Sequence, residues 1–490
     1  MNRLGGTQKG TNPLRLNIAR VHVPLSAVLA AWAMRKIGSG LGWLVQHPLL
    51  FVPVLVVWFG LRLLDGHGMA ATLFVVLTLA AGLVVWRVAS PEAFTRLVRW
   101  RLRGWWRGLT VYRYYWQPAM VTANLAVRTD SKEYLPRLLK VRSTGTVDRV
   151  LVRMLPGQVL EDWTSMAPRL AQTFDAPECR VRTTAHHQRL ELWFLVEDPL
   201  TKPIPPSITA ASDAPDLEAL PMARREDGLT YLLRLLGTHL LVVGATGSGK
   251  GSVIWSLLHS VGPAIRDGLV RVWCLDPKGG MELAPGRGLF ARFVYGDPDE
   301  GNDYEAEFAQ MLEDAVVVMR RRQSALRGLT RLHTPSVVEP LILVVVDELA
   351  SLTAYVTDRD AKRRISSALS LLLSQGRAVG VTVVGAVQDP RKEILSMRDL
   401  FPTRVALRLS EADHVGLVLG QGARDRGARC DQIPESLPGV GYVGIDGVAE
   451  PVRVRFAHVT DADIAQTVID YAPQPSTVSQ LITTGPEAVA

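Results

Sequence analysis

Residues 239–252 read HLLVVGATGSGKGS. The run up to Val243 predicts a short buried strand, and the residues after Lys250 are compatible with a helix. A strand, a glycine-rich loop and a helix in this order are typical of a P-loop. In such a loop, backbone N–H groups surround phosphate oxygens and the lysine neutralises the β- and γ-phosphates. The stretch therefore predicts an α/β domain that binds a nucleoside triphosphate.

The loop departs from the usual pattern at one position. A serine or threonine normally follows the lysine and holds Mg²⁺, whereas this chain has Gly251 there and Ser252 one place further on. We expect Mg²⁺ to keep an extra water or to use Ser252, and turnover to be slow. The predicted phosphate-binding set is Gly244, Ala245, Thr246, Gly247, Ser248, Gly249, Lys250, Gly251 and Ser252.

A second apolar run, Leu341 to Val346, ends in Asp347 and Glu348. Such a strand is typical of a Walker B motif, in which one carboxylate orients Mg²⁺ and the next polarises the attacking water. The competing interpretation is an apolar strand followed by an acidic helix N-cap. Beside a P-loop we favour the nucleotide site, with Asp347 as metal ligand and Lys250, Asp347 and Glu348 as catalytic residues.

Further apolar strands alternate with helical stretches, which indicates a mostly parallel sheet covered by helices. The expected strands are His239 to Val243, Val270 to Leu275, Leu341 to Val346, Val381 to Val387 and Arg404 to Leu409. A long amphipathic helix is expected over residues 303–329. Its Arg320 to Arg322 run is expected to be a solvated helix end or a surface that faces a polyanion.

Two runs near the N-terminus, residues 37–61 and 66–86, contain no Asp, Glu, Lys or Arg. Each is long enough to cross about 30 Å of hydrocarbon as a helix. Basic residues precede the first run and follow the second, so both termini are predicted to be cytoplasmic. We expect a two-helix hairpin in the cell membrane, with the bilayer as a partner. A cleaved signal peptide is the alternative.

The rest of the chain divides by composition. Aromatic residues interleave with arginine just after the second run, where an interfacial belt is favoured over a base-stacking surface. The expected segments are a basic N-terminus (1–36), two membrane helices (37–89), a basic aromatic segment (90–139), a small α/β module (140–198), a Pro-rich linker (199–225), a motor domain (226–458) and a partly disordered tail (459–490).

Charge and cysteine content narrow the function classes only a little. The formal net charge of +8 suits phosphate or lipid headgroups, although base composition of the genome also explains arginine richness. The three cysteines, Cys179, Cys274 and Cys430, show no spacing for zinc or for a disulfide framework.

Several stretches resemble motifs of the FtsK/SpoIIIE family. Besides residues 238–244 and the P-loop, they are DPKGGMEL (276–283), RAVG (377–380) leading to Gln388, and FPTRVA (401–406). The resemblance covers residues 226–458. It implies a RecA-like core that hydrolyses ATP with Mg²⁺, a hexameric ring around double-stranded DNA, and a membrane tether. Within the family, the chain most resembles the TraB/TraSA-like transfer ATPases of actinobacterial conjugative elements.

By the same resemblance, Gln388 is expected to sense the γ-phosphate, with a buried structural amide as the alternative. Arg377 and Arg404 are the candidates for an arginine finger that acts on the neighbouring subunit. The family's Gln-Arg-Pro reads Gln388-Asp389-Pro390 here. Only 34 residues follow Phe456, too few for the family's winged-helix module. We therefore expect weak sequence preference and a partner protein that specifies the DNA.

The function predicted is a membrane-anchored, ATP-dependent translocase of double-stranded DNA that serves conjugative transfer between cells. Three alternatives stay open. They are a chromosome-partitioning translocase, a protein-export ATPase like those of type VII secretion, and a membrane switch that binds nucleotide without motor activity.

Overall fold

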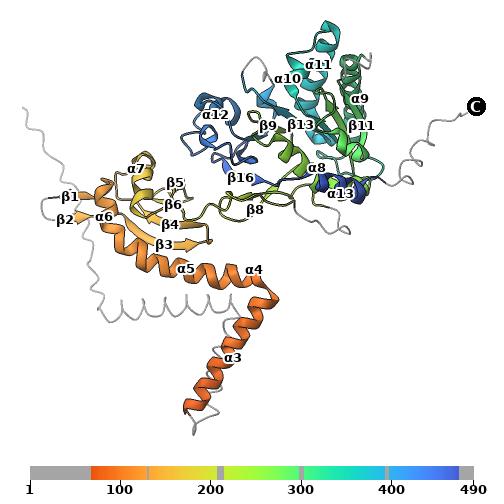
Figure 1. Cartoon of the computed structure of the whole chain (residues 1–490). Coiled ribbons are helices and arrows are strands. Elements are labelled where there is room, and N and C mark those ends of the chain that lie inside the picture. The colour runs from red at the N-terminus through yellow and green to blue at the C-terminus, as the bar shows by residue number, and fades with distance from the viewer. Residues whose placement is uncertain (1–67, 130–131, 207–214, 297–302, 392–396, 474–490) are drawn as a thin grey trace, which may run out of the picture. The chain divides into compact units, whose positions relative to one another are not determined.

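The computed structural model describes residues 68–129, 132–206, 215–296, 303–391 and 397–473 (Figure 1). It divides into two compact units, Met1–Leu97 and Val98–Ala490. The predicted membrane run 37–61 lies outside the described residues, as does the end of the tail.

In the first unit, helix α3 (Gly68–Ala89) is followed by α4 (Pro91–Phe94). The rings of Trp86 and Phe94 meet edge to face, with centroids 5.7 Å apart. The predicted membrane run 66–86 overlaps α3. Within the described part of the chain, no helix is long and apolar enough to cross a membrane, so the expected hairpin is not supported there.

Helical turns of the second unit pack on a small sheet. After the π-helical segment Thr95–Arg99, which spans the boundary at Leu97, these turns are α5 (Trp100–Arg107), π-helical Gly108–Arg113 and α6 (Tyr114–Thr122). Tyr112 and Trp116 are buried in the module core. The prediction of a purely interfacial aromatic belt is therefore wrong for these two residues, while Trp105 and Trp106 are 63% and 61% exposed.

The small α/β module is larger than predicted, because the helical turns supply part of its core. Its antiparallel sheet has the order β3-β4-β6-β5 and is covered by α7 (Leu160–Thr173). The strands are β3 (Arg137–Ser143), β4 (Val147–Arg153), β5 (Glu178–Thr183) and β6 (Arg189–Leu195), preceded by the hairpin β1 (Val127–Thr129) and β2 (Lys132–Tyr134).

The other face of this sheet contacts the motor domain through charged side chains. Arg180 Nη1 lies 2.6 Å from Glu226 Oε2 and Arg149 Nη2 lies 2.8 Å from Asp227 Oδ2. Trp193 lies between two guanidinium groups, because the carbons of Arg149 and Arg182 are 4.0 and 3.9 Å from its ring centroids. These paired charges lie inside one compact unit, Val98–Ala490.

The motor domain is built on a ten-stranded mixed sheet with the order β11-β10-β12-β13-β9-β14-β15-β16-β7-β8. The six strands from β11 to β14 run parallel, and β15, β16, β7 and β8 extend the sheet antiparallel. Their bounds are β7 Leu220–Arg225, β8 Thr230–Leu233, β9 Leu240–Val243, β10 Val270–Asp276, β11 Phe290–Tyr295, β12 Leu341–Val346, β13 Val381–Val387, β14 Thr403–Ala406, β15 Val440–Ile445 and β16 Val452–Phe456.

Helices cover both faces of this sheet, which explains why its central strands are continuously apolar. Leu241 and Val243 join the core under α9, α10, α11 and α12, while Leu240 and Val242 join the core under α8 and α13. Figure 1 shows α9, α10 and α11 grouped together on the motor domain. The helices are α8 Lys250–Arg266, α9 Tyr304–Leu326, α10 Leu349–Thr353, α11 Arg359–Gln375, α12 Ala412–Leu419 and α13 Asp461–Tyr471, with short 3₁₀ turns at Ala284–Leu289, Arg377–Val379, Arg398–Leu400 and Cys430–Gln432.

Two local expectations need correction, and the cysteines behave as the sequence predicts. The segment expected as linker over 199–225 ends in β7, which pairs with β16 inside the motor sheet. Arg322 is not solvated, because it is 3% exposed and donates to the carbonyl oxygens of Val379, Gly380 and Pro340. All three cysteines are free and buried, so they form neither a disulfide nor a reactive surface thiol.

Candidate nucleotide site

The parallel strands bring the predicted site residues to one edge of the sheet. Strand β9 leads into the P-loop, β10 ends at Asp276, β12 leads to Asp347, and β13 leads to Gln388. Because parallel neighbours end at the same edge, residues far apart in the sequence meet at their carboxyl ends, where α/β sheets bind ligands.

Two glycines give the P-loop its curvature. Gly247 and Gly249 have φ values of 72° and 95°, which side-chain-bearing residues rarely adopt. Gly249 caps helix α8, and a Cβ there would lie 2.4 Å from the backbone nitrogen of Gly439. Glycine is therefore required at position 249, both for the turn and for the close approach of the 438–439 segment.

Lys250 lies at the first position of α8, with its ammonium group folded over the loop. Its Nζ donates to the carbonyl oxygen of Gly244 at 2.8 Å and is 3.4 Å from that of Ala245. The lysine and the helix N-terminus thus point positive charge at the same loop, as phosphate binding requires.

The two acids predicted to form a Walker B pair meet a second lysine. Lys278 Nζ is 3.0 Å from Asp347 Oδ2 and 3.4 Å from Glu348 Oε2. Asp347 and Glu348 are only 4% and 5% exposed. Within the described residues, neither oxygen of Glu348 accepts a hydrogen bond of good geometry. Glu348 is therefore a buried carboxylate with spare acceptor capacity, which fits a residue that binds a water or a cation.

Burial and charge shift the ionisation of this cluster. Burial raises the pKa of Glu348, against the opposing effect of Lys278 and Lys250. Burial also raises the pKa of Asp276, and Asp347 adds to the effect. Burial lowers the pKa of Lys250. Burial would lower the pKa of Lys278 too, but the adjacent Asp347 and Glu348 outweigh it and the net pKa is raised.

Gln388 lies at the rim of the site rather than in the core. It is exposed, so the alternative of a buried structural amide is wrong. Its Oε1 accepts from Thr246 Oγ1 at 3.3 Å. Both residues line a hollow of about 260 Å³ beside the P-loop, together with Asp389 and His414. Gln388 is thus in contact with the phosphate loop, as a sensor must be.

The two arginine-finger candidates do not lie in this chain's own site. Arg404 is paired with Asp446, in the turn that follows the neighbouring strand β15. Arg377 precedes β13 and is exposed, and within the described residues it makes no hydrogen bond or ion pair. The arginine that does touch the P-loop is Arg408, whose Nη2 donates to the carbonyl oxygen of Thr246 at 2.8 Å.

Asp276, Lys278 and Arg408 are site residues to which the sequence alone gave no role. Asp276 ends a strand and Arg408 follows one, and both strands end at the P-loop edge, so each carries a signal that was available. Lys278 lies in the family-like motif 276–283, but its position opposite Asp347 depends on β10 being the neighbour of β12.

The residues present fit a Mg²⁺–nucleotide complex. Asp347 and Glu348 offer hard oxygen donors of the kind Mg²⁺ prefers, and Mg²⁺ usually takes its other ligands from phosphates and water. Two observations support this fit: the buried Glu348 carboxylate, which has only an ion pair with Lys278 and no hydrogen bond of good geometry from the described residues, and the close backbone approach at Gly249.

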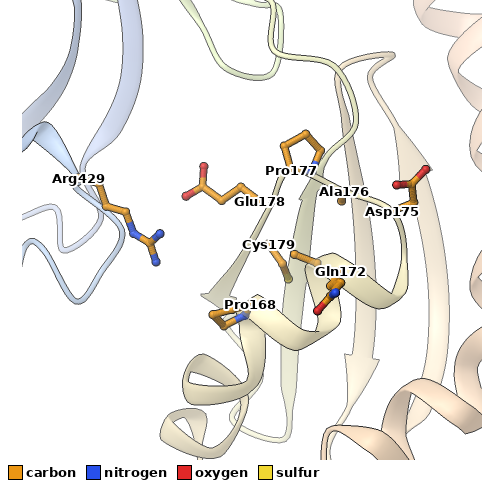
Figure 2. Close-up of a pocket in the computed structure, with 9 residues that line it drawn as sticks. Pro168, Gln172, Asp175, Ala176, Pro177, Glu178, Cys179 and Arg429 are labelled. Atoms are coloured by element: carbon orange, nitrogen blue, oxygen red, sulfur yellow. The ribbon is translucent and has the colours of Figure 1, made fainter. Parts of the chain in front are cut away.

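A larger hollow of about 480 Å³ lies elsewhere, between the module and Arg429 of the motor domain (Figure 2). Pro168, Gln172 and Glu178 line it, and none of the P-loop or Walker B residues does. Its lining offers no concentrated positive charge, so the nucleotide site is assigned to the sheet edge.

A parallel sheet with a P-loop after one strand and an acid pair after another defines a P-loop nucleoside triphosphatase. The FtsK/SpoIIIE family matches this chain over residues 216–415. That part of the chain is an FtsK/SpoIIIE family domain, which makes it a nucleotide-binding ATPase domain.

Two curated relatives frame this assignment. The transfer protein TraSA of Streptomyces ambofaciens is 28% identical over 382 residues, which cover 72% of this chain and 86% of TraSA. The DNA translocase FtsK of Staphylococcus aureus is 28% identical over 254 residues, which cover 48% of this chain and 29% of FtsK. The chain thus spans most of TraSA but less than a third of FtsK.

Solved structures with a similar fold include conjugation and secretion proteins. The pCW3 conjugation coupling protein TcpA with ATPγS has a TM-score of 0.44 and 18% identity, over 73% of this chain and 98% of TcpA. The cytoplasmic domain of the type VII secretion ATPase EccC of Thermomonospora curvata has a TM-score of 0.43 and 21% identity, over 60% of this chain and 34% of EccC.

Proposed function

We propose that this chain is an ATP-driven translocase of double-stranded DNA that serves conjugative transfer between cells. The observation that carries the proposal is the meeting of Lys250 with Asp347 and Glu348 inside an FtsK/SpoIIIE family domain. The relative TraSA, named as a transfer protein, aligns with this chain over most of its own length. This favours transfer over chromosome partitioning.

The residues divide the work of hydrolysis. The P-loop amides and Lys250 bind the phosphates, and Arg408 holds the loop through Thr246. Bound Mg²⁺, held by Asp347, would neutralise charge that develops on the phosphates. Glu348 accepts a hydrogen bond from the attacking water and orients it. Gln388, in contact with Thr246, reports whether the γ-phosphate is present.

The motor is proposed to act as a hexameric ring around duplex DNA. Ring motors complete each site with an arginine from the neighbouring subunit. Arg377 is the stronger candidate for this role, because it is exposed while Arg404 is occupied by Asp446. Arg377→Ala should then abolish ATP turnover without loss of nucleotide binding, and mixing it with a Lys250→Ala chain should restore some turnover in the mixed rings.

We further propose that residues 37–61 and 66–86 anchor the chain in the cell membrane with both termini in the cytoplasm. Support comes from the two charge-free runs and their basic flanks. A cysteine at Asp65 should react with a membrane-impermeant maleimide in intact cells, and one at Lys9 should not. Equal labelling at both positions, or release of the chain by alkaline carbonate, would contradict the anchor.

DNA binding is proposed to be electrostatic and largely independent of sequence. The net charge of +8 suits phosphate contacts, whose affinity falls steeply with salt. A partner protein would then select the DNA to be moved. Tight binding of one short repeat by the purified chain alone would contradict this part of the proposal.

The decisive experiment measures ATP turnover by the purified chain with and without linear duplex DNA, against Glu348→Gln. Strong stimulation by DNA that disappears in Glu348→Gln supports the translocase. Turnover that ignores DNA points to protein export, and absence of turnover in the wild-type chain points to a nucleotide-binding switch.

A further inference from the structure

The start of helix α8 lacks the hydroxyl that P-loops place after the lysine. Gly251 occupies that position, and Ser252 follows it. Successive helical residues point about 100° apart, and Ser252 lies on the side of α8 that faces Gly439. Ser252 is therefore turned toward a backbone segment and is poorly placed to replace the missing group.

The space beside Gly251 is occupied by a carboxylate. A Cβ on Gly251 would lie 3.5 Å from Glu282 Oε2, and apart from the neighbouring residues and the backbone of α8 no other atom of the described residues comes within 4 Å of it. A serine hydroxyl would extend from that Cβ into the same region. Glu282 is also close enough to Lys250 to affect its ionisation. The Glu282 carboxylate thus lies near the position of the hydroxyl that usually follows the P-loop lysine, but it comes from another part of the chain.

The buried side chain of Asp276 fixes the turn that carries Glu282. Asp276 is fully buried and accepts from the backbone N–H of Lys278 at 3.1 Å and from that of Leu283 at 3.2 Å. Leu283 is buried too, at 1% exposure. Both ends of the turn are therefore fixed, and Glu282 projects from it next to the P-loop.

The carboxylate of Glu282 is available to a ligand. Glu282 is exposed, and no hydrogen bond or ion pair from the described residues engages its carboxylate. Glu348 is 5% exposed, and apart from its ion pair with Lys278 at 3.4 Å its oxygens accept no hydrogen bond of good geometry from the described residues. The carboxylate oxygens at the site can therefore accept more interactions than Lys250 and Lys278 provide. This indicates that the site also binds a cation.

We propose that Glu282 replaces the missing hydroxyl as an oxygen donor to the Mg²⁺ that accompanies the nucleotide, so that Gly251 and Glu282 form one functional pair. A larger residue at 251 is unnecessary because the carboxylate fills the role. The metal–nucleotide complex is the one that the proposed function hydrolyses, and this role of Glu282 rests on that function.

A carboxylate differs from a hydroxyl in its charge, and this gives a distinctive signature. Near triphosphate, Glu282 repels a nucleotide that arrives without metal and attracts the metal that comes with it. Replacement by glutamine should therefore weaken binding of the metal while leaving metal-free nucleotide binding unchanged or tighter. Loss of a merely structural contact would weaken both.

The test uses the full chain, purified in detergent, with Mn²⁺ as the probe metal and ATPγS as the nucleotide. Electron paramagnetic resonance measures free Mn²⁺, and a fluorescent ATPγS analogue in EDTA measures metal-free binding. Glu282→Gln should weaken Mn²⁺ binding about tenfold or more without weakening metal-free binding. Glu307→Gln, an exposed carboxylate in the first turn of α9, is the matched control and should change neither.

A rescue distinguishes ligand replacement from damage to the turn. Gly251→Ser places its Cβ at an ordinary contact distance from residue 282 and should restore most of the Mn²⁺ affinity in the Glu282→Gln background, while it changes little in the wild-type background. Mn²⁺ affinity within twofold of wild type in Glu282→Gln, or equal weakening with and without metal, would overturn the role of Glu282. Because DNA is absent, failure of translocation leaves this test intact; failure of wild-type protein to bind nucleotide would instead refute the ATPase itself.

Discussion

Glu348 is the residue whose loss should separate nucleotide binding from turnover. Glu348→Gln keeps the shape of the side chain but removes the carboxylate that orients water, so turnover should fall about 10²- to 10⁴-fold. The P-loop and Lys250 are untouched, so fluorescent ATP should bind with unchanged or higher affinity. Equal loss of binding and turnover would show that Glu348 holds the nucleotide rather than the water.

Gly251→Ser should keep or raise ATP turnover. The added side chain meets only Glu282, at an ordinary contact distance, and it adds a hydroxyl of the usual P-loop kind. Steady-state ATPase assays with saturating Mg²⁺ measure the effect, with Gly251→Ala as the control for the added carbon. A large drop in Gly251→Ser alone would show that the loop is built around glycine.

His239 should make the motor domain less stable in acid. It is fully buried at the start of β9, its Nδ1 accepts from the backbone N–H of Val383, and burial lowers its pKa to about 3. An unfolded histidine titrates near pH 6.5. The folded state therefore has its full stability with respect to His239 above about pH 6.5. As the pH falls from there toward 3, protonation of the unfolded state lowers the free energy of unfolding by about 1.4 kcal/mol per pH unit.

Thermal midpoints of wild type and His239→Asn at pH 7 and pH 5 test this expectation. Asparagine retains an acceptor for Val383 but does not titrate. The wild-type midpoint should fall more than that of the variant between the two pH values. Parallel shifts would show that other groups dominate the acid response.

At the scale of elements, the loop after β9 depends on Gly249, which the segment 438–439 approaches closely. Gly249→Ala places a Cβ at φ of 95° and 2.4 Å from Gly439, so it should lower the thermal midpoint and abolish nucleotide binding. Gly447→Ala is the control, because Gly447 has a similar φ of 81° but nothing within 4 Å. It should cost only about 1–2 kcal/mol and leave binding intact.

Strands buried on both faces were predictable from the sequence, and others were not. The bounds of β12 and β13 match the predicted runs, because a strand covered by helices on both faces is apolar at every position. Strands β7, β8, β15 and β16 are antiparallel and partly exposed. Their mixed composition resembles linker, which is why β7 was assigned to a proline-rich connection.

Some residues of the candidate site were likewise predictable from the sequence, and others were not. Asp347 and Glu348 were predictable because they directly follow an apolar strand, and Lys250 because it ends the glycine-rich loop that follows another. The approach of Lys278 to Asp347 depends on the order of strands in the sheet, and that of Glu282 to Gly251 depends on a turn fixed by Asp276. Neither contact can be predicted from one sequence, because each depends on how distant segments are arranged in the fold.

At the scale of the whole molecule, a buried ion network joins the α/β module to the motor domain. Arg180 contacts Glu178, Glu226 and the hydroxyl of Tyr442. Its side chain and that of Glu226 are 10% and 7% exposed. The module should therefore move with the motor sheet during each ATP cycle.

Arg180→Met should destabilise the chain by about 3–5 kcal/mol, because it leaves Glu226 buried with a weakened partner. Adding Glu226→Gln should recover part of that loss, since the stranded charge is then removed. Thermal midpoints of the two single variants and the double variant measure the coupling. Strictly additive losses would show that the two side chains do not act as a pair.

The burial of all three cysteines has a practical consequence for watching the motor at work. A single cysteine engineered on the surface, for instance at exposed Glu307, would be the one thiol open to a maleimide dye in the folded chain. Fluorophores placed this way would let movement along DNA be followed one molecule at a time, without first removing the native thiols from the protein.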